Sequence, residues 1–248
     1  MDKYVHGMDW TGGDGGGFTL FKNYRNFQYS VIKDYIGKEI LEVGTGDKTF
    51  TEQVLEHKRG KYNLLSIEPS STLVALHEDK NHFPDNFTFL PLDLFEMHGD
   101  FLNMFDTVLM IHVLEHIERD VEAINKIHSL LKNDGYLLIQ VPAYQWLYSD
   151  HDRSIGHFRR YSKKSLSEKI DSSKFEVVKM SYQDPIGILG SLLYFKILKV
   201  KLNSQDGTKL VKNQGQFYEN FIIPFEQYLD KYFSFPFGLS LTAVLKKI

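Results

Sequence analysis

The sequence contains no cysteine among its 248 residues. Disulfides, thiolate zinc sites and cysteine nucleophiles are therefore excluded, because each of them needs a cysteine sulfur. No apolar run approaches the roughly 20 residues that a membrane-spanning helix requires. The amino-terminal stretch around Asp2, Lys3 and Asp9 also lacks the apolar core of a signal peptide. We therefore expect a cytoplasmic protein.

The chain also lacks a strong charge of either sign. Its formal net charge is -3, which argues against a general nucleic-acid binder. Hydrophobic residues make up 42% of the sequence and charged residues 25%, as in globular proteins. A chain of this length can form one large α/β domain, or one domain with an insertion.

What the sequence does contain is a glycine turn after an apolar run, in residues 40–46. Glycine has no Cβ, so Gly44 and Gly46 allow main-chain N–H groups to come close to a ligand. The helix expected at residues 49–57 would point its positive amino-terminal end at the same place. This arrangement predicts a nucleotide-type ligand at the carboxyl end of a strand.

Apolar runs and helical patterns alternate along most of the chain. The pattern predicts strands at residues 39–43, 63–67, 87–90, 105–111, 136–141, 175–181 and 237–246. It predicts helices at residues 18–35, 49–57, 70–78, 119–131 and 163–170. Such an alternation is typical of an α/β fold with a Rossmann-like, doubly wound and mostly parallel sheet covered by helices on both faces.

About fifty residues separate the last two expected strands, which is far more than an ordinary connection needs. We interpret residues 184–236 as a helical insertion. Residues 1–183 and 237–248 then form the core, in which residues 1–36 are an amino-terminal cap segment. The insertion could be a lid, a homodimer interface or, through its apolar and lysine-bearing stretch 186–202, a peripheral membrane contact.

Two carboxylates follow the second and third expected strands. Glu68, followed by Pro69, lies 24 positions after Gly44, where a carboxylate can accept two hydrogen bonds from a ribose diol. Asp93, followed by Leu94, can accept a hydrogen bond from an adenine amino group. The alternatives are a surface acid for Glu68 and a residue that caps the next turn for Asp93.

With these residues the sequence resembles the class I S-adenosylmethionine-dependent methyltransferases. Residues 42–46 look like their first motif, Glu68 like their ribose acid and Asp93 like their adenine acid. Residues 105–117 are similar to their fourth motif, which is the most specific match. The resemblance covers about residues 24–183 and the final strand. It implies S-adenosylmethionine as cofactor and a seven-stranded sheet whose last strand runs antiparallel beside the sixth.

The resemblance also implies roles for single residues. Glu42 would hold the amino group of the cofactor, and Gly44 and Gly46 would line its methionine part. Pro69 would lie at the same site beside the ribose acid. Residues near Leu94 and at His112 would flank the adenine and the sulfonium. The sequence departs from the family at Lys48, where many members have glycine or another small residue.

The fourth-motif segment contains the pattern H-x-x-E-H at residues 112–116, which invites a metal interpretation. Zinc proteases with this pattern place it inside a long helix. Here we expect a strand to end at His112 and a helix to begin at His116. Some metal-dependent RNA methyltransferases carry a similar E-x-x-E-H pattern. We nevertheless expect no metal, with Glu115 and His116 capping the helix and shaping the floor of the site.

A second concentration of polar residues follows the strand at 136–141. Residues 152–161 read D-x-x-x-G-H-x-R-R-Y, which resembles a signature of a bacterial branch of these methyltransferases. Loops held over a scaffold tend to carry function, so we predict that Arg159, Arg160 and Tyr161 bind an anionic group of the acceptor. The alternative is that both arginines pair with helix acids and that Tyr161 packs.

Three histidines are candidates for the general base, because imidazole titrates near neutrality. His157 is the first choice, and His151 and His112 are the second choices. The predicted function is O-methylation of a small molecule or a glycan. Alternatives are N- or C-methylation of another acceptor, including RNA, and a non-catalytic binding partner that keeps the nucleotide pocket. Net charge disfavours the RNA alternative.

Overall fold

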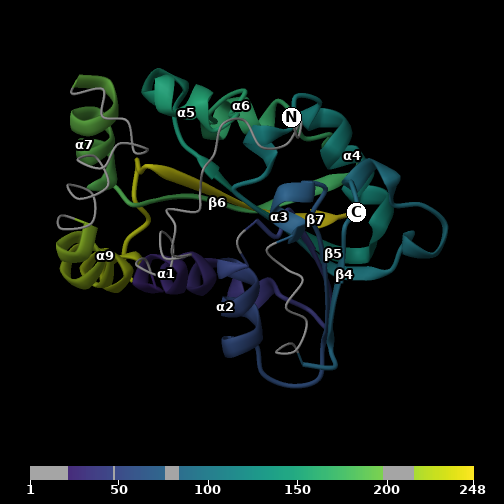
Figure 1. The fold of residues 1–248 in the computed structure, drawn as a ribbon. Helices are drawn as coiled ribbons and strands as arrows, with labels where there is room; N and C mark the ends of the chain where they lie inside the picture. Colours follow the sequence, from purple (N-terminus) through teal and green to yellow (C-terminus); the bar gives the residue numbers. More distant parts are fainter. Residues whose placement is uncertain (1–21, 47, 76–83, 198–214) are drawn as a thin grey trace.

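The computed structural model describes residues 22–46, 48–75, 84–197 and 215–248 of the chain (Figure 1). Their strands form one seven-stranded sheet in the order β3-β2-β1-β4-β5-β7-β6. The strands are β1 (Glu39–Val43), β2 (Asn63–Ile67), β3 (Phe87–Leu90), β4 (Phe105–Ile111), β5 (Leu131–Pro142), β6 (Phe175–Gln183) and β7 (Ser240–Lys247).

The first five strands pair in parallel, whereas β7 runs antiparallel to both β5 and β6. This topology confirms the Rossmann-like sheet with an antiparallel last strand. The described helices are α1 (Lys22–Ile32), α2 (Thr49–His57), α3 (Ser71–Ala75), α4 (Asp120–Leu130), α5 (Asp150–Ser154), α6 (Lys163–Ser167), α7 (Gly187–Ser191) and α9 (Ile223–Asp230).

Buried apolar side chains form two clusters, which hold the helices against the sheet. There are two because alternate residues of a strand point to opposite faces of the sheet. On β1, Leu41 and Val43 belong to one cluster and Ile40 belongs to the other. The first cluster includes side chains of α4 and α6, and the second includes side chains of α1 and α2. Helices on opposite sides of the sheet are visible in Figure 1. Covering both faces explains why the strands are apolar runs.

The first four strands begin and end at the predicted residues, but β5 does not. It begins at Leu131 rather than at residue 136, because Leu131 pairs with Phe105 before a shift in the strand register. Asp134 has a φ of 62°, so its Asn-Asp-Gly turn is an irregularity within the strand. A turn signal in the sequence therefore does not mark a strand boundary here.

Later boundaries differ from the predictions by a few residues. β7 begins at Ser240, the first residue that pairs with both neighbouring strands. β6 continues to Gln183, α6 ends at Ser167 and α4 ends at Leu130. Residues 18–21 and 76–78, which were expected to be helical, and residues 198–202 of the apolar stretch lie outside the described residues.

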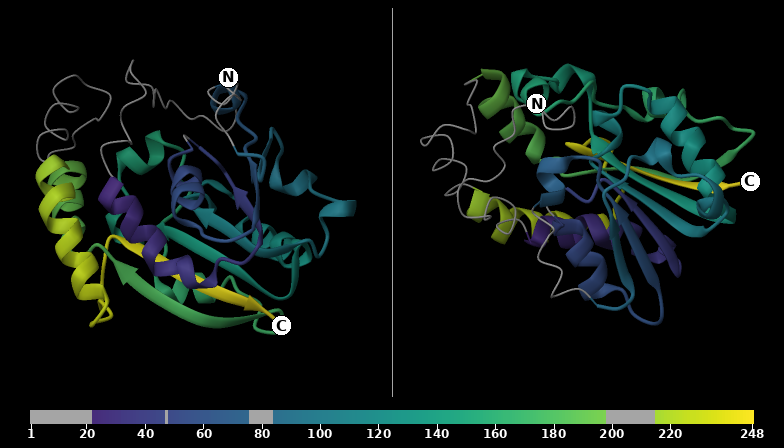
Figure 2. Two further views of the ribbon diagram at one scale, coloured as in Figure 1. Left: turned by 90° about the horizontal axis from the view of Figure 1, so that it is seen from below. Right: turned by 45° about the vertical axis from the view of Figure 1, so that its right-hand side comes forward.

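Residues 184–236 lie between β6 and β7 in the chain. Besides α7 and α9, their described parts include the π-helical turns η8 (Leu192–Ile197) and η9 (Tyr218–Ile222). α9 packs against α1, and Figure 2 shows the two helices next to each other. The Glu219 carboxylate accepts hydrogen bonds from the backbone N–H groups of Asn23 and Tyr24. Within the described residues, none of the helices has the length and apolar character needed to cross a membrane.

Candidate functional site

The glycine turn lies at the carboxyl end of β1, beside the ends of β2 and β4. Gly44 and Gly46 have φ values of 73° and 55°, in the left-handed region that favours glycine. The N–H groups of Gly44 and Thr45 donate to the Ile67 carbonyl at 2.9 and 3.2 Å. A Cβ on Gly44 would lie 2.6 Å from Val113 Cγ2. Both the conformation and the space therefore require glycine at this position.

Lys48, where the sequence departs from the resembled family, does not prevent the turn. Its φ is 68°, a conformation that costs a non-glycine residue roughly 1–2 kcal/mol. Its N–H donates to the Thr45 carbonyl at 3.0 Å, and its own carbonyl accepts from Glu52 N at 2.9 Å. Lys48 thus closes the turn and begins α2.

Glu42 lies on β1 with 2% of its surface exposed. Its carboxylate accepts hydrogen bonds from Thr51 Oγ1 at 2.6 Å and from Ser66 Oγ at 2.5 Å. Hydroxyl groups of α2 and β2 therefore hold this acid at the end of β1. Its predicted contact with the amino group of a cofactor stays a prediction.

Glu68 joins the two loops that follow β1 and β2. Its carboxylate accepts hydrogen bonds from Gly46 N and Ser70 N, each at 3.0 Å. The side chain is 5% exposed, and Pro69 continues the loop behind it. Hydrogen bonds to a charged acceptor are stronger than those between neutral groups, so Glu68 stabilises the glycine turn through Gly46 N.

Asp93 is at the start of a one-turn 3-10 helix, η4 (Leu94–Glu96). Its carboxylate accepts from Phe95 N at 2.8 Å, and the Glu96 carboxylate accepts from Asp93 N at 3.2 Å. This is the capping geometry that the sequence left as the alternative. Leu94 is 4% exposed and packs into the core. The adenine contacts of both residues stay predictions.

His112 follows the last residue of β4 and has a φ of 55°. Its Nε2 lies 2.8 Å from the amide nitrogen of Gln28 on α1, which can donate to it. Its Nδ1 lies 3.3 Å from Glu115 Oε1. The side chain is 29% exposed, whereas that of His157, which also faces Glu115, is 10% exposed.

The sequence predicts that a helix begins at His116, but the H-x-x-E-H segment does not lead directly into a helix. Residues 114–116 form a single 3-10 turn, η6 (Leu114–His116), and α4 begins only at Asp120. His116 therefore does not begin the long helix, and Glu115 does not cap it. The left-handed conformation at His112 turns the chain at this point, and the Glu115 side chain is fully buried.

Three histidines surround the Glu115 carboxylate. His157 Nε2 lies 3.9 Å from Oε1, on a different segment from His112 and His116. Burial alone would raise the pKa of Glu115, but the histidines, His112 first among them, hold it below the ordinary value. Burial lowers the pKa of His116 to about 4, so this imidazole is neutral at pH 7.

Asp152 on α5 is the centre of the loop that follows β5. Arg160 Nε and Nη2 donate to its two carboxylate oxygens at 2.7 and 3.0 Å. His157 Nδ1 lies 2.9 Å away, and Ser149 N donates to it at 2.9 Å. Asp152 is fully buried; burial would raise its pKa, but His157 and Arg160 hold the pKa well below its ordinary value.

Arg159 and Tyr161 pair with a second acid, Asp120, at the start of α4. Arg159 Nη1 lies 2.8 Å from Asp120 Oδ2, and the guanidinium also donates to the carbonyls of Ile117 and Glu118. The Tyr161 hydroxyl donates to Asp120 Oδ2 at 3.1 Å from a fully buried position. Arg159, like Arg160, thus has an internal acid partner, while its role at an acceptor stays a prediction.

The structure brings His112 and His157 to one carboxylate but places His151 elsewhere on the loop. Burial lowers the pKa of His151 to about 4. In the sequence, Asp152 stands out only as a member of a motif, and the position of Glu115 predicts a helix cap. The spacing of five residues between Asp152 and His157 is the signal that could have suggested their contact.

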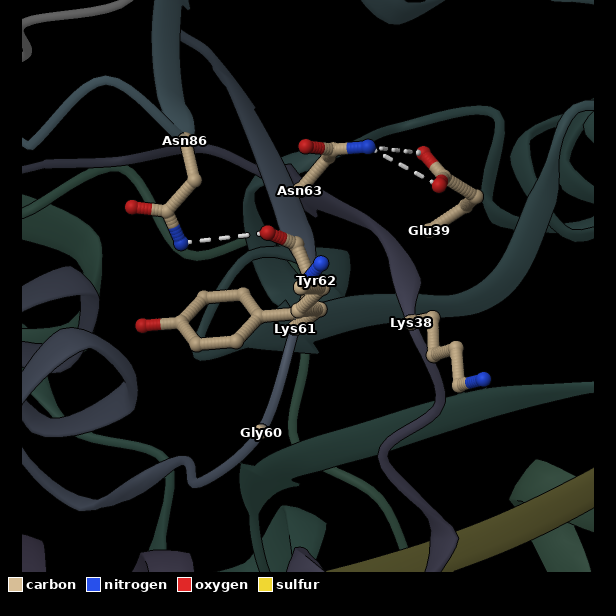
Figure 3. Close-up of a pocket in the computed structure, with 7 residues that line it drawn as sticks. All are labelled: Lys38, Glu39, Gly60, Lys61, Tyr62, Asn63 and Asn86. Atoms are coloured by element: carbon tan, nitrogen blue, oxygen red, sulfur yellow. Dashed lines mark hydrogen bonds between the residues drawn. The ribbon is translucent and has the colours of Figure 1, made fainter.

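A hollow also lies at the opposite edge of the sheet from the glycine turn. It has a volume of about 600 Å³ and is lined by residues at the amino ends of β1 and β2 (Figure 3). There Asn63 Nδ2 donates to the Glu39 carboxylate, and Asn86 Nδ2 donates to the Tyr62 carbonyl. Ligands of open α/β sheets bind at the carboxyl ends of strands, so we do not assign a function to this hollow.

We expect Asp152→Asn to destabilise the protein by about 3–5 kcal/mol, because it leaves the buried Arg160 without its charge partner. Urea unfolding at pH 7 measures this loss. Folding lowers the pKa of Asp152 below its ordinary value of about 4. The contribution of this carboxylate to the free energy of unfolding is therefore fully present above that pH. It should decrease as the pH falls below that value.

Asp150→Asn is the matched control on the same helix. Asp150 pairs with Arg153 at 2.8 Å, but both side chains are more than two-thirds exposed. We expect a loss below about 1 kcal/mol, because exposed ion pairs contribute little. Equal losses in the two variants would contradict a buried Asp152–Arg160 pair.

Comparison with known structures shows the same fold in proteins of low sequence identity. One similar structure is a chain of the complex between the Haloferax volcanii Trm112 methyltransferase activator and a methyltransferase. It is 14% identical, with a TM-score of 0.63, and the match covers 96% of this chain and 93% of that chain. N-methyltransferase NodS from Bradyrhizobium japonicum, in complex with S-adenosylhomocysteine, is 12% identical, with a TM-score of 0.57 and coverage of 100% and 99%.

A third similar structure is phosphoethanolamine N-methyltransferase 2 from Haemonchus contortus in complex with S-adenosylmethionine. It is 14% identical, with a TM-score of 0.58, and the match covers 97% of this chain and 58% of that chain. At these identities the likeness shows the fold. No curated protein matches the sequence.

The sequence itself matches a family model of methyltransferase domains over residues 26–180. This match covers more than half of the chain and includes the glycine turn, Glu68, Asp93 and residues 112–161. The chain therefore belongs to the methyltransferase domain family, whose cofactor is S-adenosylmethionine.

Proposed function

We propose that this protein binds S-adenosylmethionine at the glycine turn and transfers its methyl group to a hydroxyl of a small molecule or glycan. One observation carries the cofactor assignment. The Gly44–Gly46 turn follows the buried Glu42 and is tied through Gly46 N to the carboxylate of Glu68, at the carboxyl edge of the sheet. That edge is where open α/β sheets bind nucleotide-type ligands.

The residues present fit this cofactor. The absence of a Cβ at Gly44 lets the turn lie against Val113, and the position of a Cβ on Gly46 has no protein atom within 4 Å among the described residues, which leaves room for a ligand. Glu68 and Pro69 would hold the ribose, Asp93 and Leu94 the adenine, and Glu42 the amino group. When bound, S-adenosylmethionine supplies an electrophilic methyl group on a sulfonium.

The protein must align the acceptor, exclude water and take up the hydroxyl proton. Among the three candidate histidines, geometry favours His112 for the proton. Its ring is 29% exposed, whereas that of His157 is 10% exposed and directs Nε2 toward Glu115. The acceptor hydroxyl would replace the Gln28 amide as the hydrogen-bond donor to His112 Nε2.

The loop residues Arg159, Arg160 and Tyr161 bear on the nature of the acceptor. Asp120 and Asp152 already accept hydrogen bonds from these three side chains. An anionic acceptor would therefore bind to those N–H groups of the two arginines that these acids do not use, and to the Tyr161 hydroxyl only in place of Asp120. N-methylation is the second candidate, because two of the similar structures are named N-methyltransferases. The bacterial branch, C- or RNA methylation and a non-catalytic binding partner stay predictions from the sequence, as does cytoplasmic location.

The segment 184–236 presents apolar side chains to solvent in its described parts. Leu189 is 68% exposed and Ile197 is 71% exposed, and exposed aromatic residues follow at a spacing of four in Phe217, Phe221 and Phe225. Large exposed apolar patches are typical of binding surfaces. This supports a lid, a homodimer interface or a membrane contact, without favouring one of them.

We expect Glu68→Gln to weaken binding of S-adenosylhomocysteine by at least about tenfold, because a hydrogen bond to a charged group is worth roughly 1.5–3 kcal/mol. Calorimetric titration measures the affinity, and thermal unfolding checks that the variant is folded. Glu39→Gln, at the opposite end of β1 beside Asn63, is the matched control. An unchanged affinity in Glu68→Gln would remove the ribose assignment.

We expect His112→Asn to lower kcat about 10²–10⁴-fold, the usual contribution of a positioned acid or base. The measurement is release of S-adenosylhomocysteine with a panel of sugar and small-molecule hydroxyl acceptors. His57→Asn on α2 is the control, since His57 hydrogen-bonds within its own helix. A wild-type rate in His112→Asn would exclude this histidine as the base.

A further inference from the structure

The Glu115 carboxylate is the least satisfied buried charge beside the glycine turn. The side chain is fully buried, and neither carboxylate oxygen has a hydrogen-bond partner among the described residues. Its nearest nitrogen neighbours, at His112 Nδ1 and His157 Nε2, lie 3.3 and 3.9 Å away. Buried polar groups are almost always hydrogen-bonded, and a buried charge needs a partner of opposite charge or a metal.

Glu115, His116 and His157 have the geometry of a metal-binding group. Each offers one ligand atom, and the three atoms lie within 4.8 Å of one another. Tetrahedral ligands with bonds of about 2.0–2.2 Å would be roughly 3.4 Å apart. Glu115 Oε1 and His157 Nε2, 3.9 Å apart, would have to close by roughly half an ångström, and no pair in the group by more than about 1.4 Å.

A contact outside the group orients the His157 imidazole for such a role. Asp152 accepts from His157 at Nδ1, which leaves Nε2 with its lone pair on the side of Glu115. In metal sites a carboxylate or backbone carbonyl usually accepts the second N–H of a histidine ligand. The buried Asp152–Arg160 pair then holds the supporting carboxylate in place.

We propose that Glu115, His116 and His157 bind a divalent first-row transition metal ion. Two imidazoles and one carboxylate suit zinc, cobalt, iron or manganese, and three protein ligands leave a position open for water or substrate. The ion would also satisfy the carboxylate that has no hydrogen bond. The sequence led us to expect no metal because residues 112–116 are not in a long helix. The proposed ligands instead come from a short turn and from the loop after α5.

The binding site itself does not depend on the proposed function, but its chemical role does. If the chain methylates a hydroxyl, an open coordination position would polarise that hydroxyl and make its proton easier to remove. His112, next to the same carboxylate, would receive the proton. Metal binding and methyl transfer can therefore be tested separately.

The test is binding of Zn²⁺ and Co²⁺ to the full chain after treatment with a chelator, in the absence of S-adenosylmethionine. Calorimetry measures the Zn²⁺ stoichiometry, and the visible absorption of Co²⁺ reports nitrogen and oxygen ligands. We expect one saturable site in the wild type and its loss in both Glu115→Gln and His116→Gln. Zn²⁺ should raise the thermal unfolding temperature of the wild type but not of either variant.

His57→Asn is the control for adventitious binding, because His57 lies on α2 and interacts within that helix. Its Zn²⁺ affinity should equal that of the wild type. Glu115→Gln removes a buried charge without changing its shape, so we expect this variant to fold, and His116→Gln gives a second, independent test. Equal Zn²⁺ binding by wild type and both variants, or no saturable binding by the wild type, would overturn the proposal.

Discussion

The close approach of Gly44 to Val113 is the constraint on which the rest of the site depends. A Cβ at Gly44 would lie 2.6 Å from Val113 Cγ2, so the turn after β1 can touch the chain that leaves β4 only because residue 44 is glycine. The Gly46 N–H of the turn donates to Glu68, and the chain after β4 carries His112 and Glu115. One contact therefore joins the cofactor half of the site to the histidine half.

Much of the fold could be predicted from the sequence because each central strand is an apolar run that ends in a polar or glycine residue. β1 and β2 have the predicted bounds for this reason. The start of β5 could not be predicted, because the Asn-Asp-Gly turn around Asp134 lies inside a strand whose pairing with Phe105 depends on tertiary contact. Local turn propensity was overridden by strand pairing.

The site was predictable where position along a strand determines it, and not where packing between loops does. Glu68 was expected at a strand end and lies there, in contact with the glycine turn. The pairing of Asp152 with Arg160 could not be derived from spacing, since Asp120 was an equally suitable acid. His112, just before Glu115 in the turn, has a left-handed conformation, and although histidine is enriched at positive φ, such conformations are uncommon, so the residue type alone did not predict this turn.

A crystal structure of the protein grown with S-adenosylhomocysteine would show directly whether the glycine turn binds the cofactor. We expect the ligand at the carboxyl edge of the sheet, with its methionine part over Gly44 and Gly46 and its ribose hydroxyls on the Glu68 carboxylate. A ligand bound elsewhere, for instance in the hollow beside Glu39 and Asn63, would contradict this assignment. So would a ligand at the right edge with no contact to Glu68.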